Sequence, residues 1–322
     1  MKAVVADSVG GPENLRYVDL PDLQPAEGEA LIKVEAIGVN FIDVYFRSGL
    51  YKAPESPIRL GSEASGIVTA VGPGVSLKVG QRVAYAMARG AYAEYAAVPA
   101  KVIVPLPDAV SFEDGAAILL QGMTAHYLLR STFPLQSGQT CLIHAAAGGT
   151  GLLLVQIAKL LGATVIGTAS TDEKAQLARQ NGADHIILYS EADFVSETKK
   201  LTAGRGADVV YDSVGASTFA KSLDCLRPRG MMVSFGNSSG PVGPVEPLTL
   251  TQKGSLFLTR PSLANYISDP AELEWRASDL FSWIESGKLK TRIYKVYALR
   301  DAAAAHHDLE GRKSSGKLLL KP

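Results

Sequence analysis

The chain has 322 residues, of which 47% are hydrophobic and 20% charged, and 32 basic residues balance 32 acidic ones. This length predicts about two domains, each large enough for its own core. The neutral total argues against a basic nucleic-acid footprint. The two cysteines, Cys141 and Cys225, exclude a disulfide framework and favour a reducing compartment. Neither a signal peptide nor a membrane span is predicted, so we expect a cytoplasmic protein.

Short apolar runs broken by glycine and proline fill the chain up to about residue 122. They are rich in Val, Ile, Tyr and Ala, and they comprise residues 1–7, 29–40, 65–72, 82–86 and 91–99. This pattern predicts a small, mostly antiparallel, barrel-like β domain.

Beyond residue 122 the pattern changes to alternating strands and helices. Strands are predicted at 140–146, 163–169, 185–189, 207–215 and 230–236, with helices at 150–162 and 171–182. This alternation is typical of an α/β domain, a doubly wound parallel sheet, which we place at 123–260. Two further helices, at 272–287 and 299–311, precede an apolar final strand. We assign residues 261–322 to the first domain, together with 1–122.

A glycine-rich loop, AAAGGTG, occupies residues 145–151 between a predicted strand and a predicted helix. Glycines there let a backbone approach a pyrophosphate closely, and the helix N-terminus supplies free N–H groups. The loop therefore predicts a dinucleotide site at Gly148, Gly149, Thr150 and Gly151. The alternative is a tight turn with a structural role only.

The second strand of this unit ends at Ser170 and lacks the acidic residue that usually binds the ribose hydroxyl of NAD. Lys174 follows in the next helix, and Tyr189 follows the third strand. A lysine without a nearby strand-end carboxylate suits a 2′-phosphate, so these residues favour NADPH over NADH. Alternatively, Lys174 is a solvated helix charge and Tyr189 a half-buried aromatic.

Several segments together resemble the zinc-free, zeta-crystallin-like quinone oxidoreductases of the medium-chain dehydrogenase/reductase superfamily, above all the bacterial ones. They are VNFIDVYFRSGLY (39–51), LGSEASGIV (60–68), AAAGGTG (145–151), VVYDSVG (209–215), VSFGNSSG (233–240) and KGSLFLTRPSL (253–263). The resemblance implies a GroES-like catalytic domain, a Rossmann NADPH domain, and quinone reduction without metal or flavin. Ser62 stands where zinc-containing relatives have a histidine ligand, and no cysteine occurs before Cys141.

The resemblance also implies the site residues. From the run 39–51 come the catalytic candidates Asn40, Asp43, Tyr45 and Tyr51, which would orient the nicotinamide ribose or form an aromatic wall; ordinary packing and helix capping are the alternative roles. Further cofactor candidates are Asn40, Thr124, Ser213, Val214, Phe235, Gly236 and Ser238, with Arg260, Arg312 and Lys317 as possible phosphate ligands. Gln121 is a weaker candidate, because relatives often have lysine there.

Three other functional possibilities stay open. The same scaffold supports an enone or alkenal reductase, and some relatives are crystallins or bind RNA.

The apolar run 253–259 predicts a homodimer through an edge strand, as in the family. The five histidines show no metal spacing; His144 is expected to be packed in the core, and no metal site is predicted.

Overall fold

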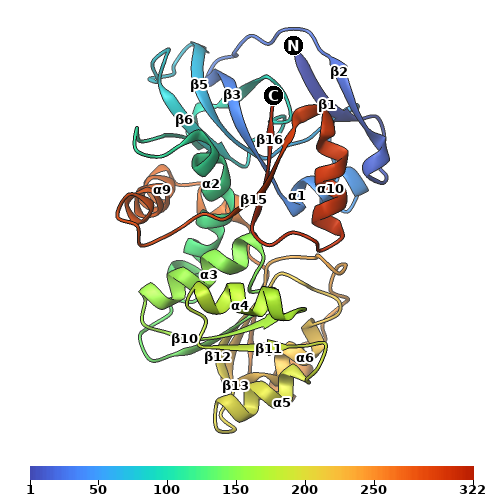
Figure 1. The fold of residues 1–322 in the computed structure, drawn as a ribbon, viewed down its shortest axis with the longest axis vertical. Coiled ribbons are helices and arrows are strands. Elements are labelled where there is room, and N and C mark those ends of the chain that lie inside the picture. The colour runs from blue at the N-terminus through green and yellow to red at the C-terminus, as the bar shows by residue number, and fades with distance from the viewer. The chain divides into compact units, whose positions relative to one another are not determined.

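The computed structural model describes all 322 residues, which form two compact units (Figure 1). Unit 1 comprises Met1–Met123 and Tyr266–Pro322, and unit 2 comprises Thr124–Asn265. The sequence had placed the corresponding boundaries after residues 122 and 260. Every helix is too short or too polar to cross a lipid bilayer.

Unit 2 contains one sheet of six strands, all parallel, in the order β11-β10-β9-β12-β13-β14. This is the Rossmann order 3-2-1-4-5-6, which confirms the predicted doubly wound sheet. The strands are β9 (Thr140–Ile143), β10 (Thr164–Ala169), β11 (His185–Leu188), β12 (Ala207–Asp212), β13 (Leu226–Ser234) and β14 (Phe257–Thr259). The helices are α3 (Gly149–Leu160), α4 (Asp172–Gln180), α5 (Phe194–Leu201), α6 (Phe219–Asp224), α7 (Pro247–Gln252) and α8 (Leu263–Tyr266).

Both faces of this sheet are covered. Val209 and Val210 are neighbours on β12 and therefore point to opposite faces, yet both are fully buried. On one face Val210 belongs to a cluster that includes Phe194 of α5 and Phe219 of α6. Ligands of such sheets bind at the carboxyl ends of the strands, where the loops are free to vary.

Unit 1 is built on a seven-stranded sheet with the path β15-β16-β3-β5-β6-β8, on which β7 also pairs with β3, and on a second sheet β2-β1-β4. The strands are β1 (Lys2–Ala6), β2 (Leu15–Asp19), β3 (Glu29–Val39), β4 (Ile58–Arg59), β5 (Glu63–Val71), β6 (Arg82–Ala86), β7 (Tyr95–Pro99), β8 (Ile103–Pro105), β15 (Ile293–Ala298) and β16 (Lys317–Lys321). The helices are α1 (Phe41–Ser48), α2 (Phe112–Tyr127), α9 (Pro270–Glu285) and α10 (Ala302–Glu310).

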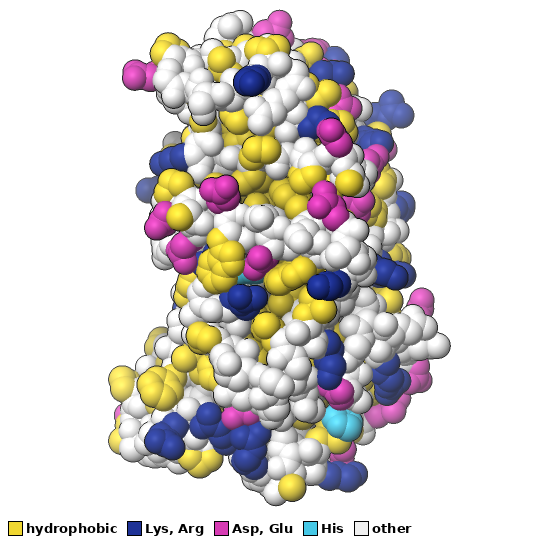
Figure 2. Space-filling model, turned by 90° about the vertical axis from the view of Figure 1, so that its left-hand side faces the viewer, with side chains coloured by type: hydrophobic (Ala, Val, Ile, Leu, Met, Phe, Trp, Pro, Cys, Tyr) yellow, Lys and Arg dark blue, Asp and Glu magenta, His cyan; other side chains and the backbone are white.

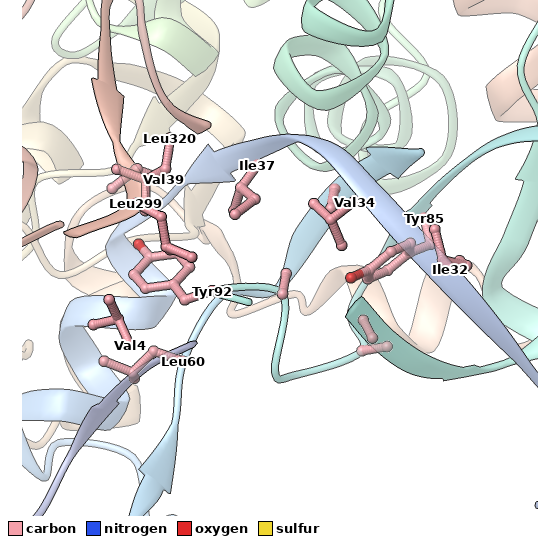
Figure 3. Packing of buried hydrophobic residues seen from close by; sticks show 14 of the residues in the cluster. Val4, Ile32, Val34, Ile37, Val39, Leu60, Tyr85, Tyr92, Leu299 and Leu320 are labelled. Carbon is pink, nitrogen blue, oxygen red and sulfur yellow. The ribbon is translucent and has the colours of Figure 1, made fainter. Parts of the chain in front are cut away.

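The core of unit 1 draws on both ends of the chain. Strand β16 pairs antiparallel with β3, so the last residues complete the sheet that the first hundred residues begin. Figure 3 shows Val4 near the N-terminus, with Leu299 and Leu320 near the C-terminus, in one buried cluster. Unit 1 therefore cannot bury this core until the C-terminal segment has joined it.

Two helices, α1 and α2, begin within the part of the chain for which the sequence analysis predicted a β domain. Helix α1 begins after Asn40, whose backbone N–H donates to the carboxylate of Asp43, and it ends at Gly49, where φ is 82°. Helix α2 begins after Ser111, whose hydroxyl accepts from the N–H of Asp114. Both starts follow the capping pattern of a polar residue with an acid three positions later. For Asp43, helix capping was the alternative role that the sequence analysis had named.

Two buried tyrosines of this core differ in their hydrogen bonding, and both are labelled in Figure 3. The Tyr85 hydroxyl has no partner, whereas the Tyr92 hydroxyl bonds to Asp43 and lies 2.9 Å from His306 Nε2. We expect Tyr85→Phe to raise the free energy of unfolding by about 1 kcal/mol, because it removes an unsatisfied buried group. Tyr92→Phe should lower the free energy of unfolding by about 1–3 kcal/mol, because it leaves Asp43 and His306 without this hydrogen-bond partner.

Urea unfolding of the two variants beside the wild type measures both effects. The matched pair changes the same single atom in the same core. Equal destabilisation by both substitutions would show that the Tyr85 hydroxyl is satisfied.

Candidate active site

An aromatic cluster surrounds helix α1 in unit 1. The Tyr45 ring lies 5.2 Å from the Tyr51 ring, edge to face, and the Phe46 ring lies 5.8 Å from Tyr51. Tyr45 is buried, whereas Tyr51 is 36% exposed. Such edge-to-face packing holds aromatic side chains in place, and Tyr51 is the most exposed of the three rings. The structure thus brings together these two predicted site residues.

Asp43, the third residue of α1, is fully buried in a polar network. Its carboxylate accepts from the backbone N–H of Asn40 (3.0 Å), from the Ser62 hydroxyl (2.8 Å) and from the Tyr92 hydroxyl (3.3 Å). Burial raises the pKa of Asp43 to about 6, although the bonds from Ser62 and Asn40 and the charge of Lys317 oppose the rise.

This network continues to helix α10 through Tyr92 and His306. Burial, with the nearby charge of Arg47, lowers the pKa of His306 to about 3, so its imidazole is neutral at physiological pH. Because the Tyr92 hydroxyl donates to Asp43, its oxygen accepts from His306 Nε2–H. Asp43 thereby links α1 to α10 and to the segment that contains Ser62.

A second buried polar group lies near Asp43. In this group Lys317 of β16 pairs with Glu63 of β5. The ammonium is 2.6 Å from Glu63 Oε2 and 2.8 Å from Asn40 Oδ1, and both charged side chains are essentially unexposed. Asn40 Nδ2 donates to Glu63 and to the carbonyl of Gly38, and Gln121 Nε2 approaches Asn40 Oδ1 at 3.4 Å. No group of three or more His, Cys, Asp or Glu side chains is placed to hold a metal ion.

These contacts describe three of the predicted site residues within unit 1. Lys317 is enclosed in its ion pair with Glu63. Asn40 has both amide hydrogens and its carbonyl oxygen engaged. Asp43 is likewise hydrogen-bonded and unexposed, so in unit 1 these three side chains contact one another and their neighbours. Sequence analysis could not predict these hydrogen-bond partners, because they lie up to 277 positions apart in the chain.

In unit 2 the glycine-rich loop connects β9 to α3. Gly148 is the N-cap of α3 and has no side chain to satisfy the first N–H groups of the helix. A Cβ on Gly151 would lie 2.2 Å from the Ala145 carbonyl oxygen, so only glycine fits there. Gly149 and Thr150 form the first turn of α3 and are partly exposed. The loop has the uncapped amides that an anion such as a pyrophosphate requires.

The candidates for a 2′-phosphate lie at the ends of β10 and β11, which are hydrogen-bonded neighbours. Ala169 pairs with Leu188, and Ser170 and Tyr189 follow them directly. Tyr189 is 45% exposed, and the Ser190 hydroxyl donates to the Ser170 carbonyl. Lys174 lies in the first turn of α4, where its N–H bonds to the N-cap Thr171. The structure thus places Ser170 and Tyr189 at one edge of the sheet, with Lys174 in the helix that follows.

The remaining candidates are five loop residues at the sheet edge and three residues elsewhere. At the carboxyl end of the sheet, Ser213, Val214, Phe235, Gly236 and Ser238 lie in the loops after β12 and β13. Arg260 donates to the carbonyl of Ser234 (2.9 Å) and, in the amide orientation that satisfies both, to Asn237. Thr124 is buried in α2, and Arg312 is an exposed residue of unit 1 with φ 55°. The geometry of Arg312 within unit 1 provides no evidence for its predicted phosphate contact.

The Rossmann sheet with its glycine loop, together with a β-rich unit made from both chain ends, defines a medium-chain dehydrogenase/reductase. Two family models match: the alcohol dehydrogenase GroES-like domain over residues 26–108 and zinc-binding dehydrogenase over residues 149–271. The chain is 48% identical to a quinone oxidoreductase of Pseudomonas aeruginosa, over 100% of this chain and 99% of the other. It belongs to the quinone oxidoreductases of that superfamily.

Two further matches span nearly whole chains. The structure of Escherichia coli quinone oxidoreductase complexed with NADPH superposes with a TM-score of 0.98 at 48% identity, over 100% of both chains. A 2-haloacrylate reductase of a Burkholderia species is 43% identical over 99% of this chain and 98% of its own. Both agree with the fold and family that the sequence motifs predicted.

The buried carboxylate of Asp43 predicts a pH effect on stability. Because its pKa is raised in the folded protein, Asp43 contributes stability below about pH 4 that is lost as the pH rises through about 6. Over this window we expect the free energy of unfolding of the wild type to fall relative to Asp43→Asn, by up to about 1.4 kcal/mol per pH unit. Urea unfolding at a series of pH values measures the difference.

Asp108→Asn is the control, because that carboxylate is fully exposed and should give a profile parallel to the wild type. A parallel profile for Asp43→Asn as well would mean that folding does not raise the pKa of Asp43.

Proposed function

We propose that this protein catalyses the NADPH-dependent reduction of quinones, with reducing equivalents passing directly from the nicotinamide and without metal or flavin. The observation that carries the proposal is the match along the whole chain to quinone oxidoreductases, one of which is solved with NADPH. The residues of unit 2 fit this cofactor. The uncapped N-terminus of α3 suits the pyrophosphate, and Lys174 with Ser170 and Tyr189 suits the 2′-phosphate.

The residues of unit 1 fit a flat, electron-poor substrate. When bound, NADPH would supply the reducing equivalents. Tyr51 offers an exposed ring and a phenol donor, and Tyr45 fixes its orientation by edge-to-face contact. Asn40 and Asp43 act indirectly in this proposal, because their hydrogen bonds fix the start of α1 and hence Tyr45. A quinone already attracts electrons, so it does not require the Lewis acid that an alcohol needs.

A second candidate substrate is an activated double bond, since one relative is named a 2-haloacrylate reductase. Steady-state kcat/KM values for a panel of quinones, α,β-unsaturated ketones and aldehydes, and 2-haloacrylate distinguish the two. A preference for quinones by at least tenfold supports the proposal. The reverse preference would reassign the chain to the double-bond reductases.

A purely structural or RNA-binding role is less well supported. The whole chain has a net charge of zero. On the face in Figure 2, a few Lys and Arg side chains gather at the lower left, and Asp and Glu side chains are more numerous in the upper half. Tight, salt-sensitive RNA binding in a filter assay would favour that role. We place the protein in the cytoplasm, where the free thiols of Cys141 and Cys225 would remain reduced.

The proposed 2′-phosphate site, formed by Ser170, Lys174 and Tyr189, predicts a cofactor preference that depends on Lys174. We expect Lys174→Ala to raise the Kd for NADPH about tenfold, because a charge-assisted bond to the phosphate is lost, and to leave NADH binding nearly unchanged. Fluorescence titration with each cofactor measures this. Arg179→Ala, an exposed cation at the other end of α4, is the matched control. Equal loss of NADPH binding in both variants would refute the proposed 2′-phosphate site.

The homodimer is a proposal that rests on β14, the last strand of the unit 2 sheet. It pairs with β13 on one side only, and Phe257 on it is 58% exposed. An open apolar edge of this kind favours pairing with a second copy. We expect Phe257→Lys to convert a dimer into a monomer at micromolar concentration in sedimentation velocity. Val79→Lys, also at an exposed apolar side chain, should leave the dimer intact. A monomeric wild type would refute the dimer.

A further inference from the structure

His144 follows β9 directly and is buried, as the sequence predicted. Both of its ring nitrogens are also hydrogen-bonded. Its Nδ1 lies 3.1 Å from the Thr168 hydroxyl, and its Nε2 lies 2.9 Å from the Ser222 hydroxyl. The imidazole edge packs on Phe194, with ring centroids 5.0 Å apart. Burial lowers the pKa of His144, so the ring is neutral, with one nitrogen donating and the other accepting.

The neighbours of the ring fix which nitrogen donates. On one side, the Thr168 hydroxyl oxygen accepts from the backbone N–H of Ala145 (3.3 Å), so its hydrogen is available to Nδ1. On the other side, the Ser222 hydroxyl lies 3.3 Å from the Asp212 carboxylate and 2.9 Å from the Thr218 carbonyl. Since both of these groups only accept, they share the single Ser222 hydrogen, and the Ser222 oxygen accepts from Nε2–H.

The result is a hydrogen-bond chain with one direction. It runs from the Ala145 N–H through Thr168, His144 and Ser222 to Asp212. Each hydroxyl accepts one bond within the chain. Thr168 donates to His144, and Ser222 divides its hydrogen between Asp212 and the Thr218 carbonyl. The carboxylate that ends the chain polarises the bonds before it. All of these residues belong to unit 2.

The two ends of this chain hold two loops of the cofactor site. At one end is Ala145, a non-glycine residue with φ 51°, a left-handed conformation that needs support from its surroundings. It opens the turn to Gly148, whose N–H bonds to the Ala145 carbonyl. At the other end, Asp212 accepts from the N–H groups of Val214 (2.7 Å) and Gly215 (3.0 Å).

We propose that His144 is a positioning residue for the dinucleotide. Its neutral imidazole couples the glycine loop after β9 to the Val214 loop after β12, so that both are held in the conformation that receives the cofactor. A site fixed before binding loses less conformational entropy when the ligand arrives. The inference rests on the proposed function to the extent that NADPH is the ligand.

Four substitutions test the coupling. His144→Leu removes both bonds. His144→Asn places an amide near Nδ1 and keeps the link to Thr168, whereas His144→Gln reaches the Nε2 position and keeps the link to Ser222. Thr168→Val removes the hydroxyl between His144 and Ala145 with little change of volume. For each variant, the Kd for NADPH is measured by fluorescence, and the unfolding midpoint is measured without cofactor.

We expect His144→Leu to raise the Kd for NADPH about tenfold or more, with smaller increases for His144→Asn and His144→Gln. In steady-state assays the KM for NADPH should rise while the KM for quinone stays constant. Thr168→Val should add little to His144→Leu in the double variant, because both break the same chain. A role in packing alone would lower the unfolding midpoint and leave the Kd of the folded protein unchanged.

Wild-type affinity for NADPH in His144→Leu would overturn the inference. If that variant does not fold, wild-type affinity in both Thr168→Val and His144→Asn would overturn it, and so would full additivity of Thr168→Val with His144→Gln. A wild-type protein that binds no NADPH would refute the proposed function itself, and the inference with it.

Discussion

The buried ion pair between Lys317 and Glu63 is the interaction on which unit 1 depends most. It joins the last strand of the chain to β5, and Asn40 and the N–H of Leu120 bond to the same pair of side chains. Two charges removed from water in this way require each other, because the loss of either would leave an unpaired charge in the core. The pairing therefore requires residues at both ends of the chain to fold together, as the register of β16 on β3 also does.

Unit 2 uses a buried charge in a different way. Asp212 has no cation beside it, but it accepts bonds from two backbone amides and from the Thr218 and Ser222 hydroxyls. Such donors stabilise a carboxylate through dipoles, and they fix the backbone of the loop that provides them. In the proposed site the carboxylate would therefore act through backbone geometry, because its lone pairs are directed to its own loop.

Much of unit 2 could be predicted from the sequence, and less of unit 1. The strands and helices of unit 2 follow the period of buried residues, and the place of the glycine loop follows from the order of the strands. In unit 1 no helix was predicted at α1, because the run 39–51 was interpreted mainly as site residues within a β domain. The burial of Lys317 could not be predicted, because only the fold brings it beside a residue 254 positions away.

The same contrast separates the two kinds of functional residue. In the proposed function, cofactor binding in unit 2 would depend largely on backbone N–H groups, whose positions follow from strand order and glycine spacing. The proposed substrate side in unit 1 would depend on side chains, and most of its polar ones are already engaged with each other: Asn40 with Lys317, and Asp43 with Ser62 and Tyr92. Tyr51 is the predicted catalytic residue that stays exposed. A site with so few available polar groups suits a substrate that is reactive by itself, which a quinone is and an unactivated alcohol is not.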